Sequence, residues 1–316
     1  MRLSEIFSKN KNIVINSDID GILSGIILNK YYGCEIVGFS NSKEAVWLKP
    51  GIGVYDPVYI DLYVVNPDVI CIEQHIIATD ANHLQQLKNL GTKLNPNLDR
   101  GKVFTDDYYH KYPFGTVHYL ITLMEEEGIK VDLPNLDEVI TAPNGTSITI
   151  GQLILRADDA LYSSLGPYAD NAQDWWNWLV RKSNHAASVQ LLDLEVSSTK
   201  KELNKAIKEK TGVFFVQGFG CNGKDGAFDK VTDSNECIRT EFRDFIFFVA
   251  EVMNNLDITV PTFLKAHTGV FKKRIVYGHQ KGLLDQLIND PTLFSYAFIY
   301  GPRAQYPNYS YTTNLK

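Results

Sequence analysis

The chain has 316 residues, of which 44% are hydrophobic and 22% charged, and its formal net charge is −6. These fractions are typical of a globular protein large enough for two domains, and the acidic balance argues against duplex binding over the whole surface. No apolar run is long enough to span a bilayer, and the charged segment Met1–Lys11 does not resemble a signal peptide. The four cysteines form no CxxC pair and look like buried thiols of a reducing compartment. The sequence therefore predicts a cytoplasmic protein, and the lack of a spanning run predicts no membrane partner.

The first half of the chain alternates short apolar segments with segments of helical periodicity. Residues 12–15 predict a buried strand, and the apolar residues from Ile22 to Tyr31 predict a helix that ends at Gly33. The further elements expected here are strands at 35–39, 58–64 and 69–72, and helices at 83–90, 117–127 and 148–161. This order predicts an α/β fold built on a doubly wound parallel sheet.

The second half follows a long charged helix. Residues 189–210 predict this helix, and its alternating charges favour a solvated linker. Beyond it we expect a helix at 237–254 and strands at 213–216, 259–264, 274–277 and 294–300. The predicted organisation is a first domain at 1–190, a linker helix at 191–211 and a second, smaller α/β domain at 212–316.

The junction between the first strand and the first helix, 16–21, carries the strongest functional signal. Asp18 and Asp20 project two residues apart from the carboxyl end of a strand, the edge where ligands bind in open α/β sheets. Two like charges so close are unfavourable unless a cation offsets them. A helix N-cap explains one Asp but not the second, so we weight metal binding above capping.

Three more candidate side chains lie in or directly after predicted strands and helices. Asp61 lies inside an apolar strand and needs a partner, which could be a backbone turn, an Arg or a cation shared with Asp18 and Asp20; we favour the cation. His75 follows the strand at 69–72, where an ordinary loop histidine fits equally well. Asp158 adjoins the apolar side of its helix.

The order of these residues resembles the four motifs of the DHH phosphoesterase family: Asn16-x-Asp18-x-Asp20-Gly21, Asp61, Glu73-Gln74-His75 and Asp158. The family motifs are His-x-Asp-x-Asp, a lone Asp, Asp-His-His and a further Asp, and the resemblance covers residues 10–165. The family includes manganese-dependent pyrophosphatases, single-strand exonucleases and phosphodiesterases of oligoribonucleotides and cyclic dinucleotides. The resemblance therefore implies a DHH-like first domain with metal-dependent phosphoesterase activity.

The resemblance also implies a role for each matching side chain. Asp18 and Asp61 would hold a first cation, Mn²⁺ or Mg²⁺. Asp20, Asp61 and Asp158 would hold a second, with Asp61 bridging the two ions. Together the ions would polarise the phosphoryl group and supply a hydroxide nucleophile, while His75 would contact the substrate phosphate.

Two positions depart from the family pattern where it has metal-binding histidines. Asn16 replaces the first histidine and Gln74 the middle histidine of the third motif, while Glu73 replaces an Asp. Amide oxygens are weaker ligands than imidazole for manganese-like ions and suit magnesium or calcium better. Three readings follow: a changed metal preference, a single retained ion, or an inactive protein that binds a nucleotide or a protein partner.

The C-terminal part lacks the Gly-Gly-Gly-His loop with which second domains of this family grip the substrate. Arg303 is a candidate phosphate contact because Arg binds phosphate bidentately, although an ordinary exposed Arg fits the turn at 300–303 equally well. The run Lys272-Lys273-Arg274 is open to the same two interpretations.

The function expected from the sequence is metal-dependent hydrolysis of a nucleotide, a cyclic dinucleotide or a short single-stranded oligonucleotide. The first alternative is a degenerate DHH-like protein that binds a nucleotide or a protein partner without hydrolysis. The second is a phosphatase of the haloacid dehalogenase type, with Asp18 as nucleophile and Asp20 as general acid. Ile22 stands where that second pattern has a Thr, which ranks it last.

Overall fold

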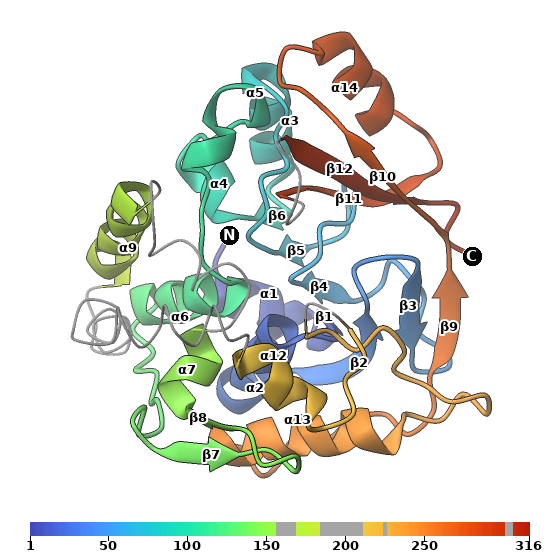
Figure 1. The fold of residues 1–316 in the computed structure, drawn as a ribbon. Coiled ribbons are helices and arrows are strands. Elements are labelled where there is room, and N and C mark those ends of the chain that lie inside the picture. Colours follow the sequence, from blue (N-terminus) through green and yellow to red (C-terminus); the bar gives the residue numbers. More distant parts are fainter. Residues whose placement is uncertain (156–168, 184–210, 224–225, 301–305) are drawn as a thin grey trace.

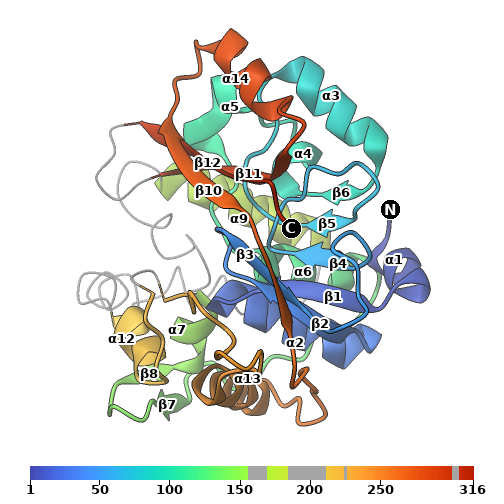
Figure 2. The same ribbon diagram turned by 90° about the vertical axis from the view of Figure 1, so that its right-hand side faces the viewer.

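The computed structural model describes residues 1–155, 169–183, 211–223, 226–300 and 306–316, and its elements lie in three layers (Figure 1, Figure 2). The middle layer is a seven-stranded sheet. Helices cover one face of this sheet, and a three-stranded sheet lies on the other side. A two-stranded sheet, β7 (Val139–Thr141) with β8 (Ser147–Thr149), lies at the periphery. Within the described ranges, no helix has the length and apolarity needed to cross a membrane.

The central sheet has the strand order β6-β5-β4-β1-β2-β3-β9. Its strands are β1 (Asn12–Asn16), β2 (Glu35–Ser40), β3 (Ala45–Leu48), β4 (Val58–Ile60), β5 (Cys71–Ile72), β6 (Lys93–Leu94) and β9 (Lys265–Thr268). The strands from β6 to β2 pair in parallel, whereas β3 and β9 pair antiparallel. The prediction of an α/β fold is confirmed, but the sheet is mostly rather than wholly parallel. The short connection 41–44 explains the difference, because a parallel crossover needs a dozen or more residues.

The remaining elements are the three-stranded sheet and the helices. The sheet has the order β10 (Val270–Ile275), β12 (Pro307–Thr313), β11 (Leu293–Tyr300). The helices in the N-terminal part are α1 (Leu3–Lys9), α2 (Ile19–Tyr32), α3 (Ala81–Leu90), α4 (Pro96–Asp99), α5 (Phe104–Asp107), the 3₁₀ helix η1 (Tyr108–His110) and α6 (Thr116–Glu126). Those that follow are α7 (Ile150–Leu155), α9 (Ala169–Ser183), α12 (Thr211–Gln217), α13 (Thr240–Val252) and α14 (Lys281–Ile288).

The core lies on both faces of the central sheet because side chains alternate along each strand. Ile13 and Ile15 of β1 belong to the cluster that contains α2, α6 and α13. Val14, between them, packs instead with Val37 and Phe294 on the opposite face. Each such fully buried aliphatic side chain contributes about 1.5–3 kcal/mol. Residues beyond position 212 therefore complete both the helical layer, through α13, and the opposite face, through β11.

Helix α2 forms where its sequence signals predict. The Asp18 carboxylate accepts a hydrogen bond from the main-chain N–H of Gly21 at 3.0 Å, and Gly33 ends the helix at a φ of 64°. Gly21 has no room for a side chain, because a Cβ there would lie 2.4 Å from the main-chain oxygen of Asn16. The turn from β1 into α2 is therefore tight, and it holds Asn16 and Asp18 at the carboxyl edge of the sheet.

Three local predictions are wrong. Residues 259–264 form no strand, because Phe263 makes only an isolated bridge with Cys237 and β9 begins at Lys265. The strand expected at 58–64 ends at Ile60, and Asp61 has a left-handed φ of 62°, so its side chain leaves the sheet. Residues 213–216 lie in helix α12 rather than in a strand, because Phe215 packs against Phe219 in the turn after α12 and against Phe248 of α13. Most of the predicted linker helix, 191–210, lies outside the described residues.

Candidate functional site

A cleft of about 270 Å³ lies between the carboxyl edge of the central sheet and the three-stranded sheet. From the sheet edge it is lined by Asn16, Asp18, Asp61 and His75. The order in which successive strands are added to the sheet reverses at this place, because β2 and β4 pair with opposite sides of β1. Such a switch point is where open α/β sheets bind ligands. Four of the side chains that the sequence singled out are therefore brought together in one cavity.

The Asp61 carboxylate is held at the floor of the cleft by two neighbours. The Asn16 side-chain amide donates hydrogen bonds to the main-chain oxygen of Asp61 and, at 2.9 Å, to its Oδ2. The Thr116 hydroxyl donates to Oδ1 at 2.9 Å. Only 3% of Asp61 is exposed, and its left-handed backbone is one that Asp tolerates better than most residues. The orientation of this carboxylate is therefore fixed by the fold.

Asp18 and Asp20 have different surroundings although they are two residues apart. Asp18 caps α2 and also lines the cleft. Asp20 is buried, and its two oxygens accept hydrogen bonds from the main-chain N–H groups of Thr116 at 2.6 Å and Val117 at 2.9 Å. It thus closes the N-terminus of α6, and it is not among the residues that line the cleft.

Burial, together with the nearby charge of Asp18, raises the pKa of Asp20 to about 7. The two hydrogen bonds from the N-terminus of α6 oppose this shift because they favour the carboxylate. Gly115, the residue before α6, has no space for a side chain, because a Cβ would lie 2.8 Å from an Asp20 oxygen. The two segments therefore fit closely around one buried carboxyl group.

The third predicted motif contributes one side chain to the cleft. Glu73 is buried, and its Oε2 accepts a hydrogen bond from the main-chain N–H of His75 at 2.6 Å. Gln74 is also buried, with its Nε2 lying 3.3 Å from Nε2 of His75. Asn95, at the end of β6, donates to Glu73 and, at 2.7 Å, to the main-chain oxygen of His75. Glu73 and Asn95 thus position the backbone that presents the His75 ring.

The cleft also has a cationic and aromatic wall, which the sequence indicated only in part. Lys43, Lys111 and Lys273 line it, and Lys43 forms a 2.6 Å ion pair with Asp229. Phe271 of β10 and Tyr311 of β12 line the side formed by the three-stranded sheet. Lys43 follows a predicted strand and so belongs to the same carboxyl edge, and Lys273 belongs to the candidate run 272–274, whereas Lys111 had no such signal.

Asn16, Asp18 and Asp61 are the side chains at the cleft that could hold a cation. Among the residues that the structure describes, no three His, Cys, Asp or Glu side chains are grouped so as to hold a metal ion. Asn16 Oδ1, however, is buried without a hydrogen-bond partner in that part of the chain. Rotating this amide by half a turn would bring Oδ1 against the Asp61 carboxylate, which is favourable only with a cation between them. After that rotation, Asn16 Oδ1 and the carboxylates of Asp18 and Asp61 would offer a cation oxygen atoms alone, the kind of ligand that Mg²⁺ prefers.

Two predicted site residues, Asp158 and Arg303, lie outside the described residues. Their proposed roles in metal and phosphate binding stay predictions. No protein-family model, curated protein or solved structure matches the chain. The residues around the cleft are therefore the basis on which a function is assigned.

Proposed function

We propose that this protein is a phosphoesterase that binds a nucleotide or a short single-stranded oligonucleotide in the cleft and uses one divalent cation. The observation that carries the proposal is the convergence of four side chains on one cavity at the carboxyl edge of the sheet: Asn16, Asp18, Asp61 and His75. Their order along the chain, which resembles the DHH motifs, supports the same chemistry.

Each residue has a part that its position supports. Asp18 and Asp61 would hold Mg²⁺ or Mn²⁺, with the Asn16 oxygen as a third ligand. The bound ion would polarise the phosphoryl group and acidify the attacking water. The Thr116 hydroxyl holds the Asp61 carboxylate in one orientation, so this carboxylate need not reorient when substrate binds. His75 presents its ring to the same cavity and would contact the phosphate.

The opposite wall favours a substrate that carries a base as well as a phosphate. Phe271 and Lys273, which share one face of β10, line it together and combine an aromatic ring with positive charge. Aromatic faces stack on bases of any sequence, and lysines near them neutralise the phosphates. A mononucleotide or short oligonucleotide uses both features, whereas pyrophosphate uses only the charge.

Hydrolysis is tested by incubating the protein with short oligonucleotides, cyclic dinucleotides and pyrophosphate in Mg²⁺ or Mn²⁺. Asp61→Asn is the informative variant, because Asn tolerates the left-handed backbone and keeps the shape while removing the charge. We expect turnover to fall about a hundredfold or more. The control is Asp68→Asn, an exposed carboxylate after β4, which should not change it. Undiminished turnover in Asp61→Asn would place catalysis elsewhere, and a phosphoenzyme on Asp18 would indicate the dehalogenase type.

Binding is tested with a fluorescent dinucleotide and two neighbouring lysines of β10. Lys273 lines the cleft, whereas Lys272, the preceding residue of the strand, points to the other face of the sheet. We expect Lys273→Ala to weaken binding about tenfold, the equivalent of ~1.4 kcal/mol, and Lys272→Ala to have no effect. Equal losses in the two variants would indicate surface attraction rather than binding in the cleft.

A second candidate is a protein that binds the same ligand without hydrolysing it. The observation that favours it is the set of hydrogen bonds that engages Asp61 and Asp20 within the protein itself. In that case the dinucleotide binds, Lys273→Ala weakens it, and no substrate of the panel is turned over. Dinucleotide binding that does not depend on a divalent cation would also support this second candidate.

A further inference from the structure

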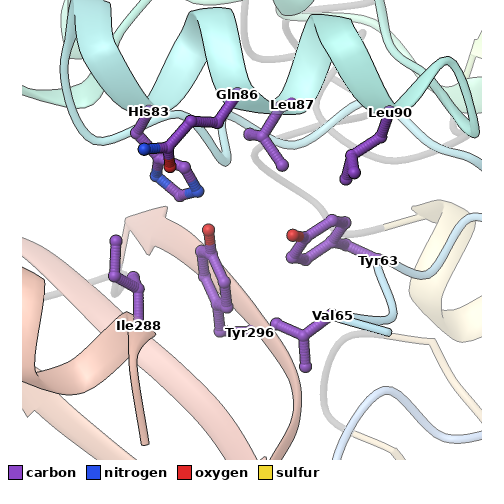
Figure 3. A pocket seen from close by; sticks show the side chains of 8 residues that line it. All are labelled: Tyr63, Val65, His83, Gln86, Leu87, Leu90, Ile288 and Tyr296. Atoms are coloured by element: carbon purple, nitrogen blue, oxygen red, sulfur yellow. The ribbon is translucent and has the colours of Figure 1, made fainter. Parts of the chain in front are cut away.

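A second cavity, of about 230 Å³, lies between helix α3 and the strands beside the cleft (Figure 3). Leu87 and Leu90 project into it from α3, and the rings of Tyr63 and Tyr296 form the opposite wall. An apolar cavity of about 150 Å³ holds benzene, so this space admits a somewhat larger, bicyclic ring. Its shape and lining are those of a site for a small aromatic molecule.

The lining of this cavity is uncharged, in contrast to that of the cleft. It includes no Asp, Glu, Lys or Arg. Burial raises the pKa values of the Tyr63 and Tyr296 phenols well above their ordinary range, and burial lowers the pKa of His83. All three groups are therefore neutral at pH 7, so the described lining offers a charged ligand no ionised side chain in direct contact. The cavity thus selects neutral molecules.

Polar groups at the middle of the cavity can orient a ligand. Nδ1 of His83 accepts a hydrogen bond from the main-chain N–H of Thr79 at 3.3 Å, which places the proton of the neutral ring on Nε2. The Tyr296 hydroxyl donates to the main-chain oxygen of Ile77 at 2.8 Å, so its oxygen can still accept. Both groups face the same space (Figure 3). A donor and an acceptor between aromatic and aliphatic walls suit a planar heteroaromatic ring.

The cavity shares part of its wall with the cleft. Tyr63 and Tyr296 line both spaces, and their rings are in edge-to-face contact at 5.0 Å. Tyr63 stands two residues beyond Asp61, and the next residue, Val64, forms a bridge with Ser295 of β11. A molecule that fixes the two tyrosines also restrains the backbone that carries Asp61. Two sites with a common wall can each bias the other's affinity.

We propose that this cavity is a second ligand site, for a neutral bicyclic heteroaromatic molecule of about the size of a nucleobase, and that its occupancy changes the affinity of the cleft. The ligand packs between Leu87 and the two tyrosine rings, with its polar edge toward His83. Binding of the ligand in this cavity can be tested without the cleft, whereas its effect on the cleft rests on the proposed function.

The first test is titration of the full chain with indole and with adenine, followed by ligand-detected NMR. Leu90→Trp fills the cavity, and 40% of Leu90 is exposed, so the larger ring needs no space in the core. Gln86→Trp, on the same face of α3, is a second blocked variant. Gln85→Trp is the matched control, because Gln85 is exposed and does not line the cavity. We expect at least tenfold weaker binding in both blocked variants and no change in the control.

The second test measures the coupling. The affinity for the fluorescent dinucleotide is compared with and without saturating indole, and we expect a change of threefold or more that Leu90→Trp abolishes. Indole binding should persist in Lys273→Ala, which separates this cavity from the cleft. The proposal is overturned if neither probe saturates, if the blocked variants bind as well as the natural protein, or if saturating indole leaves the dinucleotide affinity unchanged.

Discussion

Asp20→Asn separates the structural role of Asp20 from the metal-binding role that the sequence suggested. The natural carboxyl group is buried between α2 and the N-terminus of α6, with an oxygen on each of two N–H groups. The amide has the same shape but no charge at any pH. We therefore expect the variant to change how the free energy of unfolding depends on pH, while dinucleotide binding in the cleft is retained.

The expected change in the free energy of unfolding follows from the pKa of Asp20, which burial and the charge of Asp18 raise from 3.8 to about 7. A carboxyl group with a raised pKa stabilises the fold fully below its unfolded pKa, and this contribution is lost as the pH rises through the folded value. A shift of about 3 units at roughly 1.4 kcal/mol per unit corresponds to ~4 kcal/mol. The natural protein should lose up to this amount between pH 4 and pH 8 through Asp20, and Asp20→Asn should not.

The assay is urea unfolding at a series of pH values between 4 and 8, with the variant and the natural protein measured in parallel. Taking the difference between them cancels the titration of all other groups that the substitution leaves unperturbed. We expect the difference to shift in favour of Asn as the pH rises, and Asp68→Asn, at an exposed position, to show no such trend. A constant difference across the range would refute a buried Asp20 carboxyl with a raised pKa.

Four further predictions concern single residues. Lys93→Met should destabilise the protein by about 3 kcal/mol in urea unfolding, because the buried Nζ of Lys93 donates to the main-chain oxygens of Val64, Asn66 and Val69. The control Lys88→Met, at an exposed position of α3, should change the free energy of unfolding by no more than about 0.5 kcal/mol. Gly115→Ala should cost about 1–3 kcal/mol by overpacking against Asp20, whereas Gly282→Ala in α14, where a Cβ meets open space, should be neutral or stabilising. His75→Ala should raise the barrier to hydrolysis by roughly 2–4 kcal/mol in steady-state kinetics. Asn16→His combined with Gln74→His should raise the affinity for Mn²⁺ in calorimetry, and an unchanged affinity would reject the view that these amides replace ligands.

Local signals in the sequence were sufficient for the part of the site that lies at the first strand. The apolar run of β1, the cap at Asp18 and the left-handed Gly33 act within a few residues of one another, so the strand, the turn and α2 are predictable together. Because β1 and β4 are neighbouring parallel strands, the meeting of Asp18 with Asp61 at one edge followed from strand order alone.

Long-range contacts decide the features that the sequence did not predict. Asp20 contacts α6, which begins 96 residues later, so its helix-closing role left no local trace. Residues 213–216 form a short apolar run that fits a strand or a buried helix equally well, and packing against Phe248 selects the helix. Lys273 reaches the cleft only through the docking of the three-stranded sheet on the central one, whereas Lys111 reaches it from the end of η1.

The most direct test of the single-ion site is calorimetric titration of Mn²⁺ or Mg²⁺ into the full chain, with Asp18→Asn and Asp61→Asn measured beside it. The account predicts one ion per chain, with binding lost in both variants and retained in Asp20→Asn. Two tight sites, or a single site that survives the loss of Asp61, would contradict a centre built from Asn16, Asp18 and Asp61.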